Sequence, residues 1–248
     1  MRVRGGPATE TNKPPVMENV HSERSAGWSI FAFVALIAIA TIITSPLPSP
    51  NLRATDIGLI LESHRTQLLL AAWLTFPAAG FFLWFIVGLR SYLGHAPGRQ
   101  EGLSMLALVS GVIMIALSIF AACIESAIAY APGDVFQAYG LTGLYQLFAF
   151  LQTGVAFGPI SIFCFAIAFS MRRHESAPEW LAWLGYVAAV GCGFGSLSIF
   201  FREGFMSPTG SGPQIFGLLP AGAFLICIGL ELIKRPPGAS NETALPTR

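Results

Sequence analysis

The most informative shortage in this sequence is of charged residues. Only 11% of its 248 residues are charged, whereas an ordinary soluble domain has about 25%. The net charge at neutral pH is +1, so the chain has no basic surplus that would favour a nucleic-acid partner. The shortage is concentrated in long apolar runs, a pattern typical of integral membrane proteins.

Cysteine and histidine are also scarce, with four of each. The cysteines all lie inside apolar runs without a CxxC pair, which favours small apolar side chains over a disulfide framework. No histidine lies in the core of a run, which argues against intramembrane haem or a histidine-ligated protease metal. HExxH, the P-loop and a complete dinucleotide fingerprint are missing. We therefore predict no cofactor and no enzymatic activity.

Six long apolar runs are what the sequence does contain. Each can reach the roughly 20 residues that a membrane-spanning helix needs. The runs cover residues 28–45, 67–89, 103–124, 143–170, 180–201 and 214–233. The sequence therefore predicts an all-α, polytopic bundle of six transmembrane helices over residues 27–235. The polar segments 1–26 and 236–248 are predicted to be disordered cytoplasmic tails.

The distribution of lysine and arginine predicts the orientation. Eleven of these residues fall in the two tails and in the second and fourth loops, against three on the opposite side. Basic residues favour the cytoplasmic side of a membrane. Both termini are therefore predicted to be cytoplasmic. This agrees with an even number of spans, which places the two termini on the same side of the membrane.

Three prolines recur at one depth in the even-numbered spans. Pro77, Pro159 and Pro220 each precede a basic border by thirteen or fourteen residues, roughly 20 Å of helix. Proline removes a backbone donor and clashes one turn back, so each position is a candidate kink. The two interpretations are ordinary tolerance of proline in membrane helices and broken helices around a cavity.

Glu125 is an acidic residue at the end of an apolar run, where a carboxylate facing lipid is costly. Arg65 and Arg202 fall within about one helical turn of its predicted depth on the outer side. The three form a candidate charge cluster, in which Arg65 is the favoured partner of Glu125 and Arg202 the second. A ligand or proton site and an unpaired boundary carboxylate are the alternatives.

The fifth run contains a small-residue face that includes Gly191 and Gly195 in a GxxxG pattern. Such faces allow membrane helices to approach closely. Packing against the other helices of the same chain is favoured over homodimerisation, because five other helices need partners.

Two segments carry a resemblance to a known family. "DIGLILESHRTQLLLAAWL" opens the second run and "APEWLAWLGYVAAV" opens the fifth. In these the chain resembles a family of uncharacterised bacterial six-helix membrane proteins, described only as a domain of unknown function, over residues 28–233. The resemblance implies the fold and carries no activity or site residues.

Two functions follow as hypotheses for a multi-pass protein of the bacterial plasma membrane. The first is binding or movement of a small solute or lipid, suggested by the aligned prolines and the charge cluster. The alternative is a structural or accessory subunit that packs against another membrane protein, or a homo-oligomer. The lipid bilayer is the expected partner in either case, and nucleic acid is not.

Overall fold

The computed structural model describes residues 16–44, 54–94, 101–130, 135–174, 177–201, 204–208 and 210–234. These residues are helical or in turns, without a strand. Six helices are long and apolar enough to cross a membrane, so the chain is a multi-pass, all-helical membrane protein. They cover Arg24–Thr44, Arg65–Leu93, Gly102–Tyr130, Gly140–Arg173, Glu179–Phe200 and Ser211–Lys234, which confirms the six predicted spans.

Three of the spans are single α-helices and three are composite. The single ones are α1 (Val16–Thr44), α3 (Arg65–Gly94) and α4 (Glu101–Tyr130). The fourth span joins α5 (Val135–Ala149), the π-helical η1 (Phe150–Val155) and α6 (Phe157–His174). The fifth joins α7 (Glu179–Ser196) to the 3₁₀ segment η2 (Leu197–Phe200), and the sixth joins α8 (Ser211–Pro213), the π-helical η3 (Gln214–Leu218) and α9 (Leu219–Lys234).

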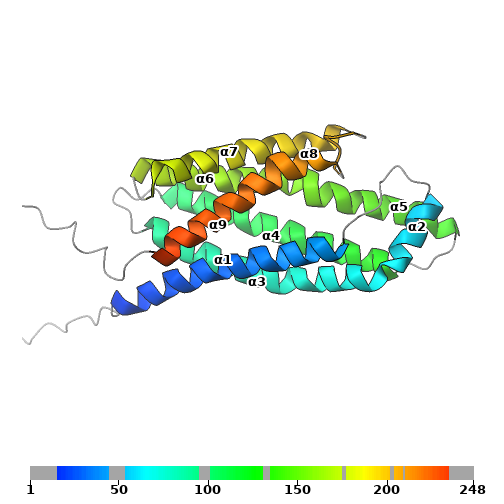
Figure 1. Ribbon diagram of the computed structural model, residues 1–248, viewed down its shortest axis with the longest axis horizontal. Helices are drawn as coiled ribbons and strands as arrows, with labels where there is room; N and C mark the ends of the chain where they lie inside the picture. The colour runs from blue at the N-terminus through cyan, green and yellow to red at the C-terminus, as the bar shows by residue number, and fades with distance from the viewer. Residues whose placement is uncertain are drawn as a thin grey trace, which may run out of the picture.

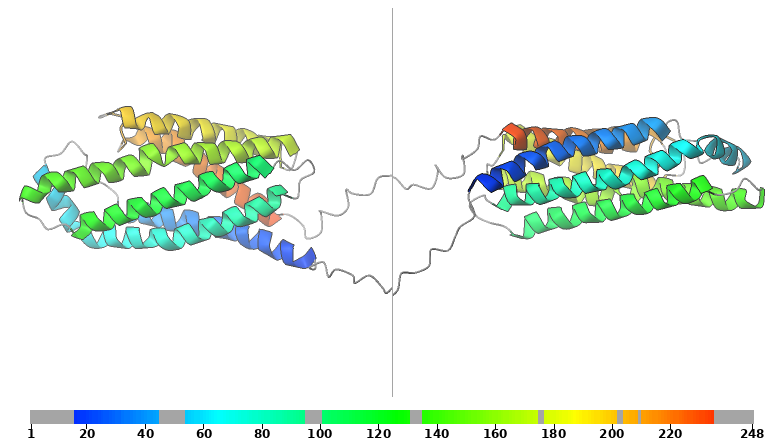
Figure 2. Two further views of the ribbon diagram at one scale, coloured as in Figure 1. Left: turned by 180° about the vertical axis from the view of Figure 1, so that it is seen from behind. Right: turned by 90° about the horizontal axis from the view of Figure 1, so that it is seen from below.

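The spans form a closed ring in chain order. Each packs against its neighbours in the sequence, and α9 returns to pack against α1. Figure 1 shows the start of α1 and the end of α9 at one end of the bundle, with α2 (Ala54–Ser63) and α5 at the other. The two views in Figure 2 show the same lengthwise packing from behind and from below.

Aromatic side chains fill the centre of this ring. Phe82 is fully buried, and its ring lies 4.7 Å from that of Phe33, 5.9 Å from Phe85 and 5.7 Å from Phe163. The four rings come from α1, α3 and α6, so they join three spans. Tilted ring pairs at these distances contribute beyond simple area burial.

The three prolines fall into two structural classes. Helix α3 runs through Pro77 without interruption, whereas π-helical segments end shortly before Pro159 and Pro220. In the wide turns, backbone N–H of Ala156 donates to the carbonyl of Leu151, and that of Leu219 to Gln214. A π-helical turn displaces the carbonyl groups with which the proline ring would otherwise clash, which explains why each π-helical segment lies just before a proline. Bending at all three prolines stays a prediction.

One boundary differs from the sequence prediction, and one helix lies outside the six predicted runs. Helix α1 begins at Val16, inside the segment 1–26 that was predicted to be a disordered tail. The residues from Val16 to Ala26 contain neither proline nor glycine, so nothing in them stops a helix from extending outward from the membrane. Helix α2 is a separate element that ends at Ser63, with a turn at His64 before α3 begins.

Candidate functional site

Glu125 lies in the C-terminal half of α4 and is 4% exposed. The residues one turn away on the same helix, Ala121, Ala122, Ile128 and Ala129, are all buried as well. Ala121 and Ile128 belong to a second apolar cluster that also takes side chains from α2, α3 and α5. The carboxyl therefore points into packed protein rather than outward from the bundle.

The predicted ion pair between Glu125 and Arg65 is not among the interactions of the described residues. Arg65 is exposed at the start of α3, and its guanidinium carbon lies 5.0 Å from the centre of the Tyr130 ring. Helices α3 and α4 are neighbours, but Arg65 lies at the level of Tyr130, the last residue of α4. Glu125 is five residues earlier, about 7.5 Å deeper. Arg202 lies outside the described residues.

A double-mutant cycle separates these two arrangements. Combining Glu125→Gln with Arg65→Gln is expected to give a coupling energy below about 0.5 kcal/mol, because the two side chains are not in contact. Combining Arg65→Gln with Tyr130→Leu is expected to give about 0.5–1 kcal/mol, the size of an exposed cation–π contact. Unfolding in detergent measures both. A larger coupling energy in the first cycle than in the second would contradict this expectation and support the ion pair between Glu125 and Arg65.

Other candidate residues do not gather around Glu125 in the described structure. Gln152, a polar residue of the fourth span, is exposed on the outside of η1. No group of three or more potential metal ligands is found among the described residues. The four cysteines are free. The thiol S–H of Cys192 donates a hydrogen bond to the carbonyl oxygen of Gly217 at 3.5 Å, which is a packing contact between the fifth and sixth spans.

An apolar groove of about 620 Å³ lies on the outside of the bundle between the fifth and sixth spans. One wall comes from α7, with Trp183, Tyr186, Val187, Val190, Gly191 and Phe194. The other wall comes from Met206, from Phe216 in η3 and from Pro220 in α9. Val187, Val190 and Phe194 are more than half exposed within a membrane span, so this surface lies on the outside of the helix bundle.

Gly191 sets the floor of the groove. A Cβ atom at this position would collide with the backbone carbonyl oxygen of Phe216, so the two spans meet here backbone to backbone. A Cβ atom at Gly195 would lie 2.6 Å from the Phe157 ring of α6. Both glycines of the GxxxG pattern are therefore used for packing within the chain. Because the fifth and sixth spans approach closely at Gly191, the larger side chains on either side of it project outward and form the walls of the groove.

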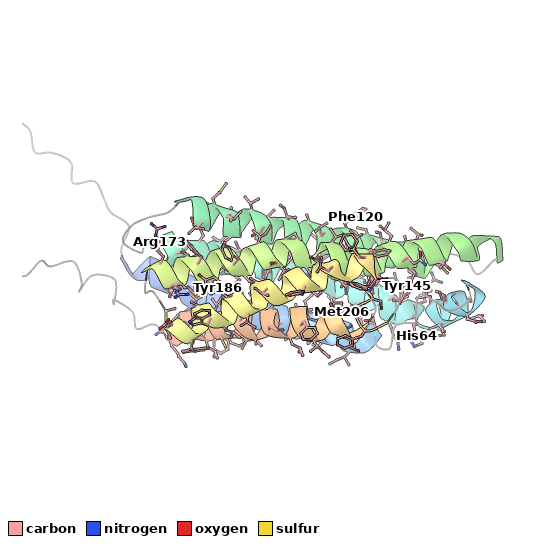
Figure 3. All side chains as sticks on the ribbon, turned by 90° about the horizontal axis from the view of Figure 1, so that it is seen from above. His64, Phe120, Tyr145, Arg173, Tyr186 and Met206 are labelled. Carbon is pink, nitrogen blue, oxygen red and sulfur yellow. The ribbon has the colours of Figure 1, made fainter. Side chains whose placement is uncertain are left out.

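An arginine contacts the tryptophan that lines one end of the groove. Arg172, in the last turn of α6, places its guanidinium carbon 4.9 Å from the centre of the Trp183 ring. The hydroxyl of Ser161 donates to the carbonyl of Ala189 at 2.7 Å, which ties α6 to α7 along the same interface. Figure 3 shows Arg173 and Tyr186 toward one end of the bundle, with Met206 farther toward the other.

The sequence alone does not predict the groove, although its GxxxG pattern indicates one of the causes. The GxxxG face marked Gly191 as a place of close approach, but did not say which span approaches it. Phe216 and Pro220 lie more than twenty residues away in the sequence, and only the tertiary structure brings them beside α7. Comparison with protein-family models, with curated proteins and with solved structures finds no match to this chain.

Proposed function

We propose that this protein binds a lipid in the groove between the fifth and sixth spans. One observation carries the proposal, namely a groove with apolar and aromatic walls that opens on the lipid-facing surface. Sites of 300–1,000 Å³ lined by apolar and aromatic side chains are typical of small-molecule binding. The wall residues can contact an acyl chain along several turns of α7. Of the two ligand classes considered from the sequence, solute and lipid, the groove favours lipid.

The rest of the functional assignment follows the sequence. The bacterial plasma membrane is the proposed location, with the end of the bundle that carries Arg172 on the cytoplasmic side. A binding role without catalysis is proposed, because the groove walls offer neither a nucleophile with a base nor a metal ligand set. The family resemblance stays a prediction.

Filling the groove tests the proposal. Val190→Trp places a large side chain between the walls, and we expect the lipid-bound fraction of the purified protein to fall about tenfold. Native mass spectrometry after extraction in a mild detergent measures this fraction. Val112→Trp is the matched control, because Val112 is a similarly lipid-exposed valine on α4, away from the groove.

Two results would contradict lipid binding. One is a wild-type protein that retains no lipid, and the other is equal retention by Val190→Trp and wild type. If the wild type is instead a dimer that only Val190→Trp dissociates, the groove is a protein interface, and the alternative role as a structural subunit replaces the proposal.

A further inference from the structure

We propose that the lipid in this groove carries an anionic phosphate headgroup, held by Arg172 and Arg173 at the end of α6. This inference rests on the proposed lipid-binding function and specifies its ligand. Both arginines are exposed in the last turn of α6, and Trp183 is the groove-lining residue closest to the start of α7. The contact between Arg172 and Trp183 therefore fixes a positive charge at the groove end.

The geometry of this contact leaves the arginine able to bind an anion. A guanidinium that stacks on an aromatic ring uses its flat face, and its five N–H donors point outward in the plane. Arg172 has no hydrogen bond or ion pair to another described residue. Glu179, at the start of α7, is exposed and forms no ion pair with Arg172 within the described structure. Guanidinium groups bind phosphate oxygens two at a time.

Apolar walls and a cationic end are complementary to one class of membrane molecule. An acyl chain is matched to the wall residues, and a phosphate with net negative charge is matched to the two arginines. Basic sites between membrane helices on the cytoplasmic side are a known mode of anionic headgroup recognition. A zwitterionic lipid offers the same chain, but its positive group opposes the arginines. The proposed occupant is therefore an anionic phospholipid.

Competition between two lipids with identical acyl chains tests the headgroup. The protein is exchanged into an equimolar mixture of phosphatidylglycerol and phosphatidylcholine, and native mass spectrometry gives the ratio of the two bound lipids. We expect wild type to favour phosphatidylglycerol about tenfold. Arg172→Gln is expected to reduce this preference to about twofold, since one of two cations is lost and the other lacks the Trp183 contact.

Two further variants sharpen the test. Arg172→Lys keeps the charge but loses the planar fork, so an intermediate preference is expected. Arg90→Gln, which removes an exposed arginine near the end of α3, serves as the matched control and should keep the wild-type ratio. A reduction by Arg90→Gln equal to that by Arg172→Gln would show a general surface effect and overturn the assignment.

The outcomes separate this inference from the proposed function. Equal retention of the two lipids by wild type overturns the anionic headgroup but leaves lipid binding intact. Retention of no lipid at all overturns both. Inorganic phosphate added to the buffer is expected to leave the ratio unchanged. If it displaces phosphatidylglycerol selectively, the arginines form a site for a free anion and the headgroup inference is wrong.

Discussion

Replacing Phe82 with alanine is expected to lower the free energy of unfolding by about 3 kcal/mol. Phe82 is fully buried and contacts rings from α1 and α6, so the substitution opens a cavity where three spans meet. In a membrane the gain from leaving water does not apply, because lipid is as apolar as the core. The loss of packing contacts and the cavity remain, which places the cost at the lower end of the range for Phe→Ala.

The neighbouring residue provides the control for this prediction. Phe81 is 42% exposed on the same helix, and Phe81→Ala should change the free energy of unfolding by less than about 1 kcal/mol. Unfolding in detergent, followed by intrinsic fluorescence or circular dichroism, compares the two variants. Similar costs for both would mean that the ring of spans does not close around Phe82.

Gly191→Ala is expected to destabilise the fold by about 2 kcal/mol, a cost within the range typical of overpacking a well-filled core. The added methyl group would meet the carbonyl oxygen of Phe216, which is backbone and cannot rotate away. The fifth and sixth spans must therefore separate. The sign is informative, because Gly→Ala in a helix ordinarily stabilises by about 0.5–1 kcal/mol.

Gly222→Ala is the matched substitution in the adjacent span. A Cβ atom at Gly222 meets no other atom within 4 Å, so this variant should be as stable as wild type or more stable. The melting temperatures of the two variants in the same detergent provide the comparison. A Gly191→Ala variant that melts with or above Gly222→Ala would remove the close contact on which the groove depends.

The architecture was predictable because it depends on local sequence. A span needs length and apolarity, and both are properties of a continuous run, so all six spans were found. The antiparallel packing of α3 and α4 follows from the short connection between them. The start of α1 at Val16 was missed because a polar helix that leaves the membrane shows none of the apolarity by which a span is recognised.

The site could be predicted only in part, because rotation about a helix axis is set by tertiary packing. Matching the depths of Arg65 and Glu125 gave the correct end of the bundle, but a difference of five residues moved Arg65 to Tyr130. Val190 and Phe216 are far apart in the sequence and line one groove only because the tertiary structure brings them together. No local sequence pattern predicts that proximity.

The most direct test of lipid binding in the groove is an experimental structure of the full chain in nanodiscs that contain phosphatidylglycerol. The result expected is elongated density between α7 and η3, in contact with Val190 and Phe216. Its headgroup end should lie beside Arg172, near Trp183. Side chains or a second copy of the chain filling this space, or lipid density that is no stronger here than around α4, would contradict the proposal.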